Sequence, residues 1–240
     1  TIAAFISLGG GAPVGQYGPL VHFGAVIGSY FSEFFGRWRI TADVFIGCGV
    51  AAAIAAGFHA PIAGVVFAHE AVLRHFSFRA ITPITIASIT SAWFSSAMFG
   101  GQLLFQIDVV PPSLLQLVPS LIASGLFFGL IAILFMRLLF ACGKLAKSTG
   151  LSELALSLIA AISCGSAAMF VPEVLGLGIG TVNTIIDNGY LIGFLFVLLV
   201  LKLSVTALSI GFGLFGGVFS PALFVGAAAG GFVAKLLALA

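Results

Sequence analysis

The sequence predicts an all-α integral membrane protein, and three observations support this prediction. Of its 240 residues, 61% are hydrophobic and only 7% are charged, whereas a soluble domain has about a quarter of its residues charged. The mean hydropathy is +1.27. Apolar stretches reach about 20 residues, which an α-helix needs to cross a hydrocarbon core of roughly 30 Å, and alternating strand patterns are absent. A net charge of +2 is too small for a nucleic-acid surface, so the expected partner is membrane lipid.

Glycine, proline and charged residues divide the chain into helical segments. The segment that starts at Pro61 is too short to cross a bilayer, so we expect a broken helix whose end lies inside the protein. Residues 114–141 exceed the length of a perpendicular span and are expected to tilt. After a short apolar run at 2–8, the expected helices cover residues 19–35, 42–58, 61–73, 81–99, 114–141, 151–171, 190–208 and 218–239.

One short pattern occurs in both halves of the chain. Gly15 precedes Pro19 by four residues, as Gly217 precedes Pro221, and an aromatic residue lies two places before each proline. Further glycines follow each proline at equal distances, at 24 and 28 in one copy and at 226 and 230 in the other. Such self-similarity predicts a fold built from repeated units.

Each copy of the pattern predicts a helix N-terminus that can attract an anion. Proline is favourable in the first turn of a helix, and the amides there have no partner within the helix. The aligned peptide dipoles add roughly half a positive charge at that end, so an anion is stabilised without lysine or arginine. The alternative is that the pattern serves packing alone. For the Gly-x-x-x-Gly pairs we expect only close packing between helices.

These residues resemble motifs of the CLC family of chloride channels and transporters. Residues 15–19, GQYGP, are similar to the family's G-[KR]-E-G-P segment, and residues 217–221, GVFSP, match its G-x-F-x-P motif. Between them, residues 57–67, GFHAPIAGVVF, resemble the family's A-x-F-N-A-P-L-A-G-x-x-F stretch. Order and spacing agree, so the chain resembles the middle of a protein about twice as long, incomplete at both ends.

The resemblance implies a CLC-like inverted-repeat bundle of tilted and broken helices. Residues 1–101 would form the second part of the first repeat, 102–112 the connection, and 113–240 the first part of the second repeat. It also implies a homodimer with a chloride pathway in each subunit, and we expect it in the inner (plasma) membrane of a bacterium. Chloride would be the substrate, and no cofactor is expected.

The resemblance also assigns site residues. Backbone amides at Val218 and Phe219 would contact a central anion, and those around Gln16, Tyr17 and Gly18 an outer one. The helix starts themselves would be formed by the motif residues Gly15, Pro19, Gly217, Ser220 and Pro221.

Two positions depart from the family pattern. The family's gating glutamate is Tyr17 here, and a phenol with a pKa of about 10 does not carry protons readily near neutral pH. The family's inner proton glutamate aligns with Ala71; Glu70 is its neighbour, turned by about 100° on a regular helix. We therefore predict passive, channel-like anion conduction without tight proton coupling. The alternatives are a chloride/proton antiporter with a relocated proton carrier, and a degenerate member in which Tyr17 only lines the wall.

Other functions find less support in the sequence. Neither G-x-S-x-G nor H-E-x-x-H occurs, so we expect no enzyme, and a non-conducting scaffold is a further alternative. His69 and His75 are six residues apart, on opposite faces of a helix, so we expect no metal site. Lys202 lies in an apolar helix, where we expect a structural ion-pair partner rather than a role in attracting anions.

Overall fold

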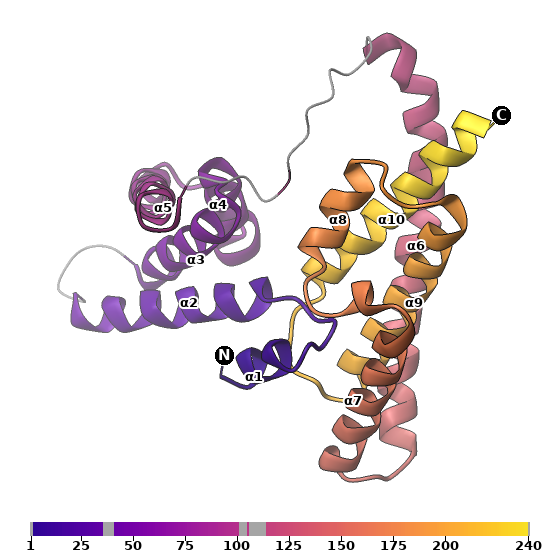
Figure 1. Ribbon diagram of the computed structural model, residues 1–240. Helices are drawn as coiled ribbons and strands as arrows, with labels where there is room; N and C mark the ends of the chain where they lie inside the picture. The colour runs from indigo at the N-terminus through magenta and orange to yellow at the C-terminus, as the bar shows by residue number, and fades with distance from the viewer. Residues whose placement is uncertain (1, 36–40, 101–104, 106–113, 240) are drawn as a thin grey trace. The chain divides into compact units, whose positions relative to one another are not determined.

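In the computed structural model the described residues are 2–35, 41–100, 105 and 114–239. These residues are helical with short connections, and their only strand-like pairing is one isolated β-bridge, which confirms the all-α prediction. The helices, shown in Figure 1, are α1 (Ile2–Gly9), α2 (Tyr17–Phe34), α3 (Ala42–Phe58), α4 (Pro61–Phe67), the π-helix η1 (Ala68–Leu73), α5 (Phe78–Phe99), α6 (Leu114–Ser148), α7 (Glu153–Phe170), the 3₁₀-helix η2 (Pro172–Val174), α8 (Ile179–Ile186), α9 (Ile192–Gly211) and α10 (Phe219–Leu239).

Four helices of the described chain are long and apolar enough to cross a membrane by length and composition. They are α7, α9, most of α10 and the part of α6 that spans Leu121–Ser148. These helices agree with the prediction of an integral membrane protein. Helix α4 has seven residues and is too short to cross a bilayer by itself, as the broken-helix expectation requires.

The chain divides into two compact units. Unit 1 comprises residues 17–104, and unit 2 comprises residues 2–16 together with 105–240. Except for Phe105, the predicted connection 102–112 lies outside the described residues. Compact units and sequence repeats are different properties, so the assignment of repeats to 1–101 and 113–240 stays a prediction.

Helix α3 is the centre of unit 1 and packs against α2, α4 and α5. Its contact with α2 depends on two glycines, because a Cβ on Gly24 would overlap the carbonyl oxygen of Gly49 and a Cβ on Gly28 that of Phe45. The packing role predicted for the first Gly-x-x-x-Gly pair is therefore confirmed. From α5, the hydroxyl of Ser88 donates a hydrogen bond to Pro61 O at the start of α4, at 2.7 Å.

The helix after Pro61 changes its winding halfway. His59 ends α3 in the left-handed region, with φ 52°, and Pro61 then starts α4. From Ala68 to Leu73 the backbone is a π-helix, and Arg74 ends it with φ 56°. The expectation of a regular α-helix through residue 73 was wrong here. Hydrogen bonds from i to i+5 widen the turn, so the 100° step between Glu70 and Ala71 does not hold.

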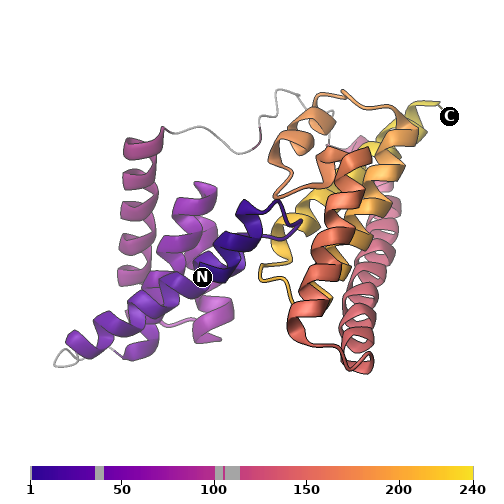
Figure 2. The same ribbon diagram turned by 60° about the horizontal axis from the view of Figure 1, so that its bottom comes forward.

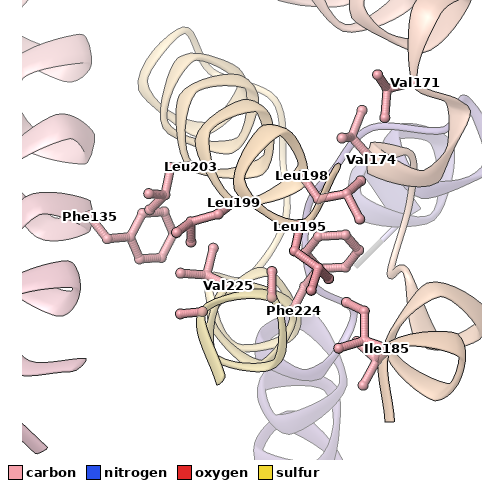
Figure 3. Packing of buried hydrophobic residues seen from close by; sticks show 13 residues of the cluster. Phe135, Val171, Val174, Ile185, Leu195, Leu198, Leu199, Leu203, Phe224 and Val225 are labelled. Atoms are coloured by element: carbon pink, nitrogen blue, oxygen red, sulfur yellow. The ribbon is translucent and has the colours of Figure 1, made fainter. Parts of the chain in front are cut away.

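Helix α9 is the centre of unit 2, and α6, α7 and α10 pack against it (Figures 1 and 2). Figure 3 shows the resulting core: the ring of Phe224 from α10 lies beside Leu195 and Ile185, and the ring of Phe135 from α6 lies beside Leu203. Phe224 and Leu195 are almost fully buried. The unit therefore has an apolar core against which the connecting segments can be fixed.

The second Gly-x-x-x-Gly pair differs from the first. A Cβ on Gly226 would meet nothing within 4 Å in the described chain, and one on Gly230 would lie 3.8 Å from the Phe128 ring. Gly231 makes the close contact instead, since its Cβ would be 2.9 Å from Ile185. The packing role of Gly226 and Gly230 stays a prediction, and the close contact in the described chain is made by Gly231, which faces α8.

Candidate functional site

The first glycines of the two motif copies are paired within unit 2. Gly15 and Gly217 form an antiparallel β-bridge, in which Gly15 N donates to Gly217 O at 2.6 Å and Gly217 N donates to Gly15 O at 2.7 Å. A Cβ on Gly15 would lie 2.8 Å from Gly217 O and 3.1 Å from Ser220 N, so this approach requires glycine. Equivalent residues are thus paired through two hydrogen bonds, and each stands two residues before the start of a helix.

Further contacts fix the segment that leads to Gly15. Thr206, buried on α9, donates a hydrogen bond to Pro13 O at 3.0 Å. Gly176 N donates to Gly11 O at 3.0 Å. Val14 is fully buried and lies so close to Gly216 that a side chain there would overlap it. Residues 11–14, which lead to the bridge, are therefore held by a side-chain hydrogen bond from α9 and a backbone hydrogen bond from Gly176.

The start of α10 presents backbone donors beside this bridge. The first helical bond joins Ala222 N to Val218 O at 3.0 Å, and Pro221, which is fully buried, has no N–H. Within the described chain, the amides of Val218 and Ser220 donate to no acceptor. The hydroxyl oxygen of Ser220 is also buried without a hydrogen-bond partner there. Backbone N–H groups that have no acceptor at a helix N-terminus favour the binding of an anion.

The side chains of the two central motif positions are half-exposed in this chain. Val218 is 45% exposed and Phe219 is 49% exposed. The residues on either side of them, Gly217 and Ser220, are held by the bridge and by burial. The backbone at Val218 and Phe219 is therefore fixed at both ends although the side chains are not enclosed.

The start of α2 belongs to unit 1 and is built differently. Tyr17 is buried, and its ring stacks on Phe58 with centroids 3.8 Å apart and planes inclined by 20°. Gly57 makes room for the ring, since a Cβ there would be 3.2 Å from the Cε1 atom of Tyr17. Gly18 is exposed and Pro19 half-buried, while Gln16, half-buried, is grouped with unit 2. The side chain at the predicted gate position is thus packed against the end of α3.

The predicted inner glutamate position, Ala71, lies in the π-helix η1. Glu70 and Ala71 are both exposed, whereas His69 is 1% exposed. His69 Nδ1 lies 2.9 Å from Val65 O, its ring stacks on Phe76, and its Nε2 has no partner in the described chain. The sequence singled out Glu70 and Ala71, whereas His69 was considered only as a zinc ligand and was rejected in that role. A buried histidine nitrogen without a partner is the feature that the sequence did not reveal.

Lys202 is fully buried in α9, and its environment differs from the predicted ion pair. Its Nζ donates to Val174 O at 2.7 Å and to Gly176 O at 2.8 Å, and lies 4.6 Å from the centroid of the Phe224 ring. No carboxylate in the described chain forms a salt bridge with it. The ion-pair partner expected from the sequence is therefore not found among the described residues, where backbone carbonyls accept the hydrogen bonds of the ammonium group. Thr206, four residues later on the same helix face, is a positioning residue that the sequence analysis missed.

No group of three or more histidine, cysteine, aspartate or glutamate side chains that could hold a metal ion occurs in the described residues. The three cysteines are free thiols. The donors that the structure does bring together, in unit 2, are backbone amides and one serine hydroxyl. Their chemistry suits an anion rather than a cation.

Curated relatives of this chain carry chloride-channel names. The chain is 29% identical to chloride channel protein CLC-e of Arabidopsis thaliana, over all of this chain and 36% of that protein. It is 27% identical to the voltage-gated ClC-type chloride channel ClcB of Shigella flexneri, over all of this chain and 57% of that protein. The chain therefore spans between about a third and somewhat over half of the length of these relatives.

Two solved structures have a similar fold. One is described as a slow cyanobacterial Cl⁻/H⁺ antiporter, with a TM-score of 0.86 and 22% identity, covering 98% of this chain and 56% of the other. The second is described as a CLC-type fluoride/proton antiporter, with a TM-score of 0.79 and 25% identity, covering 94% of this chain and 57% of the other. The family model described as voltage gated chloride channel matches residues 1–240. The chain belongs to the voltage-gated chloride channel (CLC) family, as its motifs predicted.

Proposed function

We propose that the protein conducts chloride or a similar small anion across the membrane by passive, channel-like conduction without tight proton coupling. The observation that carries the proposal is the start of α10, where amides of Val218 and Ser220 without a partner in the described chain stand next to the Gly15–Gly217 bridge. Helix N-termini supply partial charges that are fixed and weak, so an anion can bind and also leave.

The proposed path has two anion positions. Backbone amides of Val218 and Phe219 would bind a central anion, and those of Gln16, Tyr17 and Gly18 an outer one. The names of the relatives and of the similar structures refer to chloride or fluoride, which supports a small anion.

Passive conduction is supported by the two departures from the family pattern. A tyrosine packed on Phe58 at 3.8 Å fits a wall residue better than a side chain that leaves and re-enters the anion path. Ala71 has no ionisable group, and Glu70 is exposed in η1. Positions 17 and 71, where the family pattern has glutamates, therefore carry no carboxylate that could exchange a proton.

Coupled exchange of chloride for protons is the second candidate, and one observation favours it. His69 is buried two residues before Ala71, and its Nε2 is unpartnered in the described chain. Histidine can exchange a proton near neutral pH, so it is the residue to test as a relocated proton carrier.

Membership of the family also supports proposals about the activity class, assembly and location of the complete protein. Proteins of this family are channels or transporters, so the expectation of no enzymatic activity is confirmed. We propose a homodimer in a bacterial plasma membrane, with lipid around it, no nucleic acid bound and no cofactor. If the complete protein shows no anion flux, the alternative of a non-conducting scaffold applies.

Flux measurements on the complete protein in liposomes test the proposal. Chloride efflux without proton uptake is expected, and proton pumping against a gradient driven by chloride would refute passive conduction. If pumping occurs, its loss in His69→Gln would identify the carrier. Tyr17→Glu is expected to lower efflux more near neutral pH than in acid, because an ionised carboxylate competes with the anion. Absence of efflux would refute transport altogether.

A single-atom change tests the amide site directly. Replacing the amide at Val218 by an ester removes one N–H donor and keeps the side chain. We expect chloride to bind about tenfold more weakly or worse, since a hydrogen bond to a charged group contributes about 1.5–3 kcal/mol. The matched control is the ester at Ala222, whose N–H already bonds to Val218 O. Equal effects at both positions would contradict the site.

A further inference from the structure

Lys202 is a buried positive charge whose partners are all neutral. It is 0% exposed, its Nζ donates to the carbonyls of Val174 and Gly176 at 2.7 and 2.8 Å, and it lies over the Phe224 ring. Among the described residues no acidic side chain pairs with it. The carbonyls and the ring attract the ammonium group, but they do not neutralise it.

Such a residue is costly at this place. Charged groups are rare within membrane-spanning helices and face the protein interior, where they pair or mark an ion path. An apolar residue of similar volume would pack in the same core without loss of hydration, because Leu198, Leu199 and Leu203 already surround this turn of α9. The charge therefore needs a counter-charge, and the described part of the chain offers none.

The position of Lys202 connects it with the start of α10. Phe224, which its Nζ contacts, follows Phe219 by five residues on α10, so the Nζ lies on the order of 10 Å from the α10 N-terminus at a rise of about 1.5 Å per residue. Gly176, which accepts its hydrogen bond, is bonded to Gly11, four residues before Gly15. All these contacts are within unit 2.

We propose that Lys202 is a fixed positive charge that raises the affinity of the α10 N-terminus for its anion. The inference rests on the proposed function, and it names the residue that sets the affinity of that site. Lys202 does not touch the anion. It acts through space across a core that excludes water, where one unit charge at this distance changes the affinity about tenfold with an effective dielectric constant of about 20.

Three variants of the complete protein distinguish the effect of the Lys202 charge from an effect of local structure. Chloride binding is measured in each by calorimetry. Lys202→Met is expected to bind chloride about tenfold more weakly, and Lys202→Arg within about twofold of the natural protein. Thr206→Val removes the neighbouring bond to Pro13 O without a change of charge. It is expected to lower the unfolding temperature and to weaken chloride binding less than Lys202→Met does, because the positive charge stays in place. An equal loss of affinity in Thr206→Val and Lys202→Met would overturn the charge effect and leave only a positioning role.

A second pair of variants keeps Lys202 in place, so the inference stays testable if Lys202→Met does not fold. Cys164 of α7 lies close to the segment that binds Lys202, since its sulfur donates to Gly11 O at 3.8 Å, and the same oxygen accepts from the amide of Gly176, whose carbonyl binds the ammonium group. Cys164→Asp adds a carboxylate beside the ammonium group and is expected to weaken chloride binding. Cys164→Ser, of similar size and neutral, is the control.

The outcomes distinguish this inference from the proposed function. If the natural protein shows neither saturable chloride binding nor flux, the proposed function fails. If it binds chloride, and Lys202→Met and Cys164→Asp bind as tightly as the natural protein, only the role of Lys202 fails.

Discussion

Replacing Gly15 by alanine tests the bridge between the two motif copies. The new Cβ would lie 2.8 Å from Gly217 O and 3.1 Å from Ser220 N, both fixed backbone atoms. The backbone must then move by several tenths of an ångström. Overpacking of this kind costs about 1–3 kcal/mol, and weakening the bonds of 2.6 and 2.7 Å adds about 0.5–1.5 kcal/mol each. We expect a loss of about 2–4 kcal/mol in the free energy of unfolding.

The measurement is denaturant unfolding of the complete protein in detergent, together with chloride efflux from liposomes. Efflux is expected to fall with stability, since the same movement displaces the start of α10. Gly226→Ala is the control, because its Cβ meets nothing within 4 Å in the described chain and alanine favours a helix interior by up to about 1 kcal/mol. If Gly15→Ala unfolds and conducts like Gly226→Ala, the bridge does not organise the site.

Two further substitutions test the packing of unit 1, and both are measured by the same unfolding experiment. Gly24→Ala places a Cβ on the carbonyl oxygen of Gly49 and is expected to destabilise the protein by about 1–3 kcal/mol; an unchanged midpoint would contradict close contact between α2 and α3. Ser88→Ala removes the hydrogen bond of 2.7 Å to Pro61 O and is expected to cost about 1 kcal/mol in the free energy of unfolding. An unchanged free energy of unfolding would show that this bond does not stabilise the start of α4.

Much of the fold could be predicted from the positions of proline and glycine in the sequence. Proline and glycine have strong local effects on the backbone, so the break at Pro61 and the start at Phe219 were visible in the sequence. The repeated Gly-x-x-x-Pro pattern predicted that its two copies are related, and the structure pairs Gly15 with Gly217. The sequence was sufficient for these features because proline and glycine restrict or free the backbone at their own positions.

Features that depend on tertiary contacts could not be predicted in the same way. The π-helix after Phe67 has no sequence signature, since its composition also suits an α-helix. Gly226 and Gly231 are both glycines on α10, and only the position of α8 decides which one is in contact. An ion pair was expected for Lys202, but its ammonium group donates to backbone carbonyls instead. Any chain segment can supply such carbonyls when the fold brings it close to the lysine, so the sequence does not reveal them.

The pairing of Gly15 with Gly217 also constrains the order of assembly. The two glycines are about 200 residues apart, so at about 5–20 residues per second the ribosome needs roughly 10–40 s between them. During that interval the peptide groups of Gly15 lack their native partners, and a bare amide is unfavourable in hydrocarbon. Residues 2–16 therefore join unit 2 late in biosynthesis, after α9 and the turn before α10 have emerged.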